Sequence, residues 1–246
     1  MAIKIFQLDI KKHLPIVQDI RNNSVRYQYL RQKLASIFHR RRCIVFGSAG
    51  TCEPPLIGPD DVVICVNGSA HNAARSGIDV PHATFLVSHL FGRSSVQSRT
   101  TYDLLRGRHT KHAFILTGTV SMADCLVSLG EMGLHHAAVD EISGFERAAM
   151  VGDIAGVEYG FGKLNQRVST GIVAVMCAIF GGAREVNLAG FSLTNGHSYT
   201  KRLSKRLHVE PDRAFLLSCQ DLGLPITTTS AILAQECHLP LIATAG

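Results

Sequence analysis

The chain has 246 residues, of which 46% are hydrophobic and 18% charged, with a formal net charge of +6. This composition predicts a folded globular protein with one large domain or two small ones, and it excludes a disordered chain. No apolar run reaches the roughly 20 residues of a membrane-spanning helix, and the first residues lack a signal-peptide pattern, so we expect a cytoplasmic protein.

Residues 14–42 form the first predicted element, a helix in which apolar residues recur at roughly helical spacing with basic residues between them. The helix could pack on the domain, form an oligomer contact or lie on a membrane surface, and core packing is the simplest of these. The cluster "FHRRRC" at 38–43 is typical of a solvent-exposed helix end, where cations complement the helix dipole. We therefore divide the chain into an N-terminal helical segment, 1–42, and a single domain, 43–246.

Short β-branched runs alternate with helical patterns over the rest of the chain. The strand-like runs are "CIVFG", "DVVICVNG", "HATFLVS", "HAFILTG", a weaker "HAAVDE", "REVNLAGFSL" and "PITTTS". "STGIVAVMCAIFGGA" and "DRAFLLSCQDLG" have helical patterns, the first with a small-residue start and a Gly-Gly stop. This alternation predicts an α/β fold, Rossmann-like, with a mainly parallel central sheet flanked by helices.

The segments that directly follow the predicted strands are rich in Gly, Ser, Thr, Asn and His: "GSAG", "NGSA", "SHLFGR", "TGT" and "GFSLTNGHSY". Sheets of this kind bind ligands beyond the carboxyl ends of their strands. Such segments offer neutral hydrogen bonds to a polyhydroxylated or phosphorylated ligand. The turn "GSAG" at 47–50 could meet a phosphate with its backbone N–H groups or could be a plain tight turn, since it matches neither GxGxxG nor a P-loop.

Metal ligands are scarce in the sequence. The chain has no Asp-x-Asp motif, which argues against an enzyme that holds a nucleotide diphosphate through a metal. The seven cysteines are scattered without a CxxC pair, which predicts reduced core residues rather than disulfides or zinc ligands. His109, His112, His135 and His136 lack acidic or cysteine partners at ligand spacing, so we expect them at the surface.

Two segments combine residues of catalytic type. In "LNQRVSTG", at 164–171, Arg167 precedes Ser169 and Thr170 at the start of a predicted helix, and the stretch contains no carboxylate. One of the two hydroxyls is expected to cap that helix. In "RLHVEPDRAFL", His208 stands between a basic loop and a helix start, with Asp212 close by. A histidine there could act as a general base, although Pro and Asp are also ordinary residues of a first helical turn.

The segment from Asn165 to about Thr229 resembles the bacterial sialyltransferases typified by the Campylobacter lipooligosaccharide enzymes, glycosyltransferase family 42. The resemblance is carried by "NQRVSTG" before a small-residue helix, the strand "NLAG", the loop "TNGHSY" and a later histidine that opens a helix. "IVFGSAG" and "CVNG" resemble the family's first two strand ends, so the likeness covers most of 43–229. It implies a GT-A-like domain that transfers an acidic sugar from a CMP-sugar to a glycan hydroxyl, with inversion and without a metal or cofactor.

The resemblance also implies a role for each matching residue. His208 matches the general base, and Tyr199 matches one of two tyrosines that hold the leaving phosphate. Arg167 and Thr170 match the donor-site cation and hydroxyl. The predicted donor-binding residues, of which Gly47 and Asn67 face the nucleotide, are Gly47, Ser48, Ala49, Asn67, Gly68, Ser88, Ser169, Thr170, Gly171, Gly190, Thr194 and Asn195.

The chain departs from the family pattern mainly on the side of the donor sugar. The second leaving-group tyrosine falls at about Leu193 or Thr194, the first-turn asparagine falls at Ser48, and a third-strand asparagine falls near Ser88. Before His208 the chain carries four cations where aromatic residues are expected: Lys201, Arg202, Lys205 and Arg206. The donor could therefore be sialic acid or another CMP-activated acidic sugar, such as Kdo, pseudaminic acid or legionaminic acid.

Two other functions stay open. The altered tyrosine position would suit a catalytically degenerate nucleotide-binding scaffold protein. A phosphotransferase like the archaeal pterin diphosphokinases would share the glycine turn and the sheet plan, but it would need Mg²⁺ and carboxylates to hold it.

The partners expected from the resemblance are a CMP-activated acidic sugar and a glycan or lipid-linked glycan acceptor of bacterial surface polysaccharide or lipooligosaccharide synthesis. The family also implies a homo-oligomer. No nucleic acid is expected, because no nucleic-acid-binding signature accompanies the basic charge. The N-terminal helix and the basic loops suggest a peripheral contact with the inner face of the cell membrane.

Overall fold

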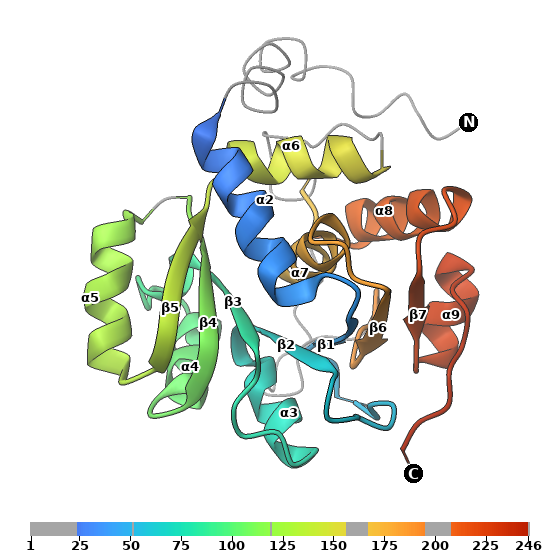
Figure 1. Ribbon diagram of the computed structural model, residues 1–246. Coiled ribbons are helices and arrows are strands. Elements are labelled where there is room, and N and C mark those ends of the chain that lie inside the picture. The colour runs from blue at the N-terminus through green and yellow to red at the C-terminus, as the bar shows by residue number, and fades with distance from the viewer. Residues whose placement is uncertain (1–23, 51, 119, 156–166, 195–207, 246) are drawn as a thin grey trace.

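The computed structural model describes residues 24–50, 52–118, 120–155, 167–194 and 208–245. Its strands form one seven-stranded sheet in the order β5-β4-β3-β2-β1-β6-β7 (Figure 1). Every neighbouring pair is parallel. The strands are β1 (Arg42–Phe46), β2 (Val62–Val66), β3 (Ala83–Val87), β4 (His109–Leu116), β5 (His135–Ile142), β6 (Glu185–Ala189) and β7 (Ile226–Thr228).

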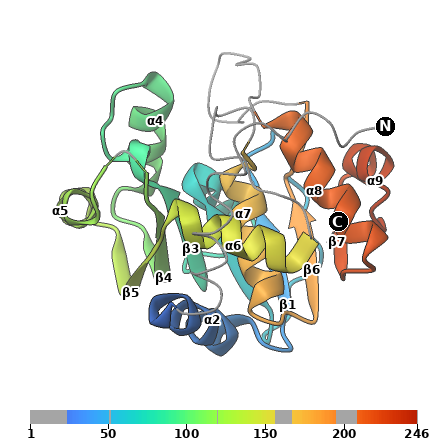
Figure 2. The same ribbon diagram turned by 90° about the horizontal axis from the view of Figure 1, so that it is seen from above.

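Helices cover both faces of the sheet, as the α/β prediction requires. Figure 2 shows α2 and α4 on opposite sides of the strands. One core cluster contains side chains of α2, α6, α7, α8 and α9, and the other contains side chains of α3, α4 and α5. The helices are α2 (Val25–Phe38), α3 (Ala70–Arg75), α4 (Val96–Leu105), α5 (Met122–Met132), α6 (Gly144–Ala155), α7 (Thr170–Phe180), α8 (Val209–Asp221) and α9 (Ala231–Cys237). The fold class is therefore confirmed.

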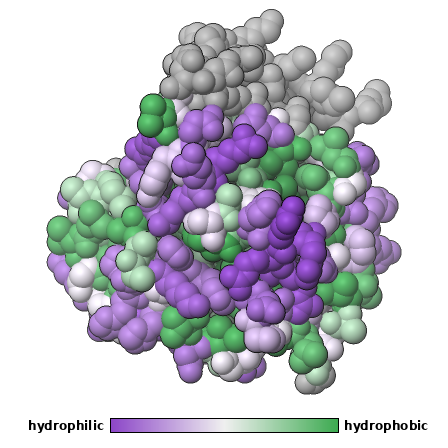
Figure 3. Space-filling view, in the orientation of Figure 1, coloured by the Kyte–Doolittle hydropathy of each residue, from purple (hydrophilic) through white to green (hydrophobic). Residues whose placement is uncertain are grey.

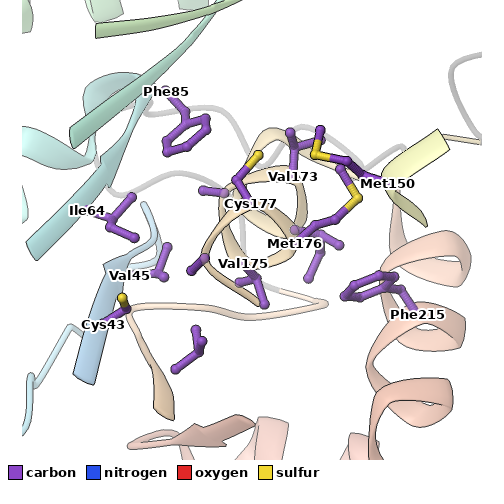
Figure 4. Close-up of a cluster of buried hydrophobic side chains, with 14 of the residues drawn as sticks. Cys43, Val45, Ile64, Phe85, Met150, Val173, Val175, Met176, Cys177 and Phe215 are labelled. Carbon is purple, nitrogen blue, oxygen red and sulfur yellow. The ribbon is translucent and has the colours of Figure 1, made fainter. Parts of the chain in front are cut away.

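Helix α7 is the central element of the larger core. It contacts α2 and α6 as well as β1, β2, β3 and β6. Its residues from Gly171 to Ala178 are all buried, which explains why its sequence is apolar on every side. Figure 4 shows Cys177 directed toward the strands, while Met176 lies between Met150 of α6 and Phe215 of α8.

The predicted N-terminal helix is only partly confirmed. Helix α2 begins after the cap residue Ser24, whose Oγ accepts a hydrogen bond from the N–H of Tyr27, and residues 14–23 lie outside the described part of the chain. The extension to residue 42 is wrong, because the helix ends at Phe38 and the chain turns at Arg40, which has a φ of 58°. The buried face of α2 joins the larger core, so the expectation of core packing is confirmed for these residues.

The basic cluster after α2 is not a free helix end. Arg42 already belongs to β1, and its guanidinium forms a two-point ion pair with Asp61 at the start of β2. The backbone N–H of Gly58 donates to the same carboxylate at 2.7 Å. Arg41 donates from Nε and Nη2 to the backbone oxygen of Asp60 at 3.0 and 2.8 Å. Two of the three arginines thus tie the start of β1 to the start of β2.

The cysteines and the paired histidines agree largely with expectation. All seven cysteines lie in the described part of the chain and are free, and all but the half-buried Cys52 are buried. Burial raises the pKa of the Cys43 thiol to about 12, so that thiol stays protonated. His109, His135 and His136 are exposed, and the first two stack with their ring centroids 4.5 Å apart. His112 is half-buried, so the surface prediction does not hold fully for it.

The face that carries α2 has both hydrophilic and hydrophobic surface. Figure 3 shows hydrophilic residues through the centre of this face and hydrophobic residues at its left edge, over α5. Leu126 and Val127 of α5 are 43% and 64% exposed. None of the described helices is long and apolar enough to cross a membrane.

Lowering the pH should destabilise the protein through His82, which precedes β3. The Nδ1 atom of His82 accepts a hydrogen bond from the N–H of Val63, so protonation would break that bond. Desolvation, together with the charges of Lys111 and Arg41, lowers the pKa of His82 from 6.5 to about 4. Between these pH values the His82 ring binds a proton in the unfolded chain but not in the folded chain. The free energy of unfolding therefore falls as the pH drops from about 6.5 to about 4. After allowance for the ring's partial exposure, we expect a loss of about 2 kcal/mol.

Urea unfolding at pH 7, 5.5 and 4.5 measures this loss. His82→Asn offers an amide oxygen to the same N–H and carries no titrating ring, so its unfolding free energy should depend less on pH over that window. His136→Asn, at an exposed position of β5, is the matched control and should keep the slope of the original chain. Equal slopes for His82→Asn and the original chain would contradict the assignment.

Candidate active site

The order of the strands reverses between β1 and β6. Starting from β1, the chain first adds β2 to β5 toward one edge of the sheet. It then adds β6 and β7 toward the opposite edge (Figure 1). Doubly wound sheets bind ligands outside the carboxyl ends of the strands at such a reversal. Gly47 follows β1 and Gly190 follows β6, so two predicted donor-binding residues lie at this point. Their segments are hydrogen-bonded: Gly47 N–H donates to Ala189 O at 2.7 Å, and Ala49 N–H donates to Gly190 O at 2.9 Å.

Close packing accounts for the glycines at this point. A Cβ atom on Gly47 would lie 2.3 Å from Gly190 O, and one on Gly171 would lie 2.7 Å from the ring of Phe191. Gly190 has a φ of 67°, and its Cβ would lie 2.8 Å from the Cys52 sulfur. The three glycines therefore bring the ends of β1 and β6 and the start of α7 together as no larger residue could. This requirement exists without any ligand.

A buried amide that sequence reasoning missed fixes the glycine turn. Asn72 in α3 is 3% exposed, and its Nδ2 donates to Gly47 O at 3.0 Å and to Ala49 O at 3.4 Å. Ala49 is itself buried, and Ser48 between these two acceptors is half-buried. An asparagine in a short polar helix gives no sign in the sequence that it points inward.

The segment before α7 holds the predicted donor-site cation and hydroxyls. Ser169 caps the helix, with its Oγ accepting a hydrogen bond from the N–H of Ile172 at 3.4 Å, so the expectation that one hydroxyl serves as a cap is confirmed. Thr170, the other hydroxyl, is the first residue of the helix. Arg167, Ser169 and Thr170 are all half-buried. The α7 N-terminus thus combines a guanidinium, a hydroxyl and the positive end of a helix dipole.

His208 lies directly against this segment. It precedes α8, and its Nδ1 atom is 2.7 Å from Arg167 O, although 41 residues separate the two in sequence. A carbonyl oxygen can only accept, so Nδ1 must carry the hydrogen. In the neutral ring, Nε2 then has a free lone pair and can accept a proton. The structure therefore brings together the predicted base and the predicted donor-site cation.

The ends of β2 and β3 supply further predicted residues. Asn67 has a φ of 47° in the turn after β2, and its Oδ1 accepts a hydrogen bond from Val87 N–H at 3.1 Å. That contact ties the two strand ends together and leaves the NH₂ group as the end of the side chain that could donate to a ligand. Gly68 and Ser88, in the short turns that follow β2 and β3, are buried.

His89, next to Ser88, is a histidine that sequence reasoning did not single out. Its side chain is exposed, yet partial desolvation lowers its pKa, and the charge of His208 lowers it further. The end of β3 and the start of α8 therefore lie near enough for their histidines to interact electrostatically.

The remaining predicted residues fall beyond β6. Leu193 is 2% exposed and belongs to the larger core, whereas Thr194 is exposed and its N–H donates to Ser192 Oγ at 3.2 Å. Of the two positions matched to the second tyrosine, only Thr194 could therefore offer a hydroxyl to a ligand. Tyr199, Asn195 and the four cations of the basic loop lie outside the described residues.

Metal binding finds no support among the residues that the structure describes. Within those ranges, no group of three or more His, Cys, Asp or Glu side chains could hold a metal ion. The expectation of a metal-independent reaction stays a prediction, because part of the chain is not included in that statement.

Comparisons of the sequence with family models and with curated proteins find no match. Solved structures do match. Monofunctional α-2,3-sialyltransferase Cst-I from Campylobacter jejuni is 16% identical, with a TM-score of 0.54, covering 82% of this chain and 80% of that one. Sialyltransferase CST-II in complex with a trisaccharide acceptor and CMP is 14% identical, with a TM-score of 0.53, covering 84% and 89%. CstII from Campylobacter jejuni with cytidine-5'-monophosphate is 15% identical, with a TM-score of 0.52, covering 83% and 86%.

The chain has the fold of these sialyltransferases. The similarity covers at least four-fifths of each chain in all three comparisons, so the likeness concerns the whole sialyltransferase fold and not one motif. At this identity it bears on fold alone, and the chemistry depends on the residues of the site.

Proposed function

We propose that the protein is an inverting glycosyltransferase that transfers an acidic sugar from a CMP-sugar to a glycan hydroxyl without a metal. The observation that carries this proposal is the contact between His208 Nδ1 and Arg167 O. It joins a histidine whose Nε2 is free to act as a base to a cationic helix start. The fold similarity to a sialyltransferase in complex with a trisaccharide acceptor and CMP supports the same reaction class.

The proposed reaction needs one base and one anion-stabilising surface. His208 Nε2 accepts the proton of the acceptor hydroxyl while its oxygen attacks the anomeric carbon. The bond from that carbon to the CMP phosphate oxygen breaks, CMP leaves with the bonding electrons, and the configuration inverts. Arg167, the Thr170 hydroxyl and the N-terminus of α7 stabilise the negative charge of the phosphate or of the donor's carboxylate.

The positive charge of the site favours an acidic sugar. A cation and a helix N-terminus together favour a ligand that carries its own negative charge near the anomeric centre, which an ulosonic or nonulosonic acid does. Sialic acid and Kdo both fit this description. The acceptor in the proposal is a glycan of the bacterial surface, free or lipid-linked.

A panel of CMP-sugars tests the proposal. Calorimetric binding, donor hydrolysis and transfer to a set of glycans should give a signal with at least one CMP-activated acidic sugar and a much weaker one with uridine diphosphate sugars. Activity should persist in excess EDTA. Binding without hydrolysis or transfer from any CMP-sugar would favour the nucleotide-binding scaffold instead, and complete loss of activity in EDTA would favour a metal-dependent phosphotransferase.

A further inference from the structure

Asp212 makes a second link between the same two segments that His208 and Arg167 join. Its carboxylate lies in the first turn of α8 and is 1% exposed. Its Oδ1 atom accepts a hydrogen bond from the backbone N–H of Ser169 at 2.7 Å, across 43 residues of sequence. The start of α8 thus makes two cross-connections to the segment before α7, one through His208 and one through Asp212.

The two links form a closed ring together with the backbone that joins their ends, Arg167 to Ser169 on one side and His208 to Asp212 on the other. His208 O accepts the N–H of Asp212 at 3.0 Å, the first backbone bond of α8. On the other side, Ser169 O accepts the N–H of Val173 at 3.0 Å, so Ser169 is held by α7. Both ends of the Asp212 contact therefore belong to regular helices, and the position of Arg167 O relative to the His208 ring follows from how these helices are joined.

Carboxylates are common in first helical turns because they complement the dipole, but that reason does not account for Asp212. Glu210 stands in the same turn and behaves in that ordinary way, with a side chain that is 76% exposed and an ion pair to Arg213 at 3.1 Å. Asp212 is buried instead, which is costly for a carboxylate unless its oxygens are satisfied. One of its contacts is with the backbone N–H of Ser169, the cap residue of another helix.

We propose that Asp212 is a positioning residue, whose carboxylate holds Arg167 O against His208 Nδ1 and so keeps the proton of the neutral ring on Nδ1 and the lone pair on Nε2. The catalytic meaning of this arrangement rests on the proposed function. The state of the His208 ring does not, and it can be measured in a protein that turns over no substrate.

Nitrogen-15 NMR of the histidine rings tests the inference, with the His208 signals assigned from His208→Gln. In the original chain the neutral His208 ring should carry its hydrogen on Nδ1. Asp212→Ala removes the acceptor of Ser169 N–H, and we expect the ring to become a mixture of both tautomers. Asp212→Asn keeps an oxygen acceptor and should keep the original tautomer. Glu210→Gln, in the same turn, is the matched control and should change nothing.

Turnover with the preferred CMP-sugar gives the second readout. Asp212→Ala should lower kcat by up to about a hundredfold, the loss expected when a catalytic group is slightly misplaced, and Asp212→Asn should recover most of it. If Asp212→Ala does not fold, Asp212→Glu decides, because it keeps the charge but displaces the oxygens and should disturb the tautomer in the same direction. An unchanged His208 spectrum in the folded variants would overturn the inference. If the His208 spectrum changed as expected in a protein without transferase activity, only the proposed function would be contradicted.

Discussion

Replacing His208 by alanine is expected to lower kcat for sugar transfer by about 10²- to 10⁴-fold, the usual contribution of a general base. The physical reason is the free lone pair on Nε2, which the contact of Nδ1 with Arg167 O leaves available to the acceptor hydroxyl. Binding of CMP should change little, because in the proposed function the nucleotide contacts the glycine turn and the strand ends rather than this ring. Steady-state kinetics with the preferred CMP-sugar and calorimetry with CMP measure the two effects separately.

His136→Ala is the matched control, since this histidine is exposed on the edge strand β5. It should keep the kcat of the original chain. Full activity of His208→Ala would show that another group takes the proton. A parallel loss of CMP affinity and of thermal stability would show instead that the histidine serves the packing between α7 and α8.

Much of the sheet could be predicted from the sequence because parallel strands are buried on both faces. Such strands read as short apolar runs, and "DVVICV" is the clearest case, since all five residues of β2 are buried. Helix α7 could also be predicted, because its buried residues form a long apolar run. Helix α4 could not be predicted in this way, because two of its four buried residues, Ser98 and Thr101, are polar and its sequence shows no clear apolar period.

The site could be predicted in its residue types but not in its contacts. Arg167 and His208 stand out because of their chemistry, and the family resemblance suggests their roles. The link between them goes through a backbone oxygen, and a sequence carries no sign of which carbonyl faces which ring. The same limit applies to Asp212, whose carboxylate looks like ordinary helix-start chemistry until its partner, Ser169 N–H, is known.

Gly47→Ala is expected to destabilise the fold by about 3 kcal/mol and to impair CMP binding. The new Cβ would lie 2.3 Å from Gly190 O, which is backbone held between β6 and its neighbours, and 2.8 Å from the ring of Phe191. A side-chain tip could move aside, but this carbonyl could not do so without separating the ends of β1 and β6. Because that reversal of strand order is also where the ligand is proposed to bind, stability and binding should fall together.

Gly50→Ala provides the control within the same turn, since nothing lies within 4 Å of a Cβ built there. It should leave the unfolding free energy within about 0.5 kcal/mol of the original value and keep CMP affinity. Urea unfolding and calorimetry on the two variants distinguish packing from ligand contact as the reason for glycine at 47. If Gly47→Ala kept full stability and lost only CMP affinity, the glycine would be needed for the approach of the ligand. If it lost only stability, the nucleotide would not bind at this turn.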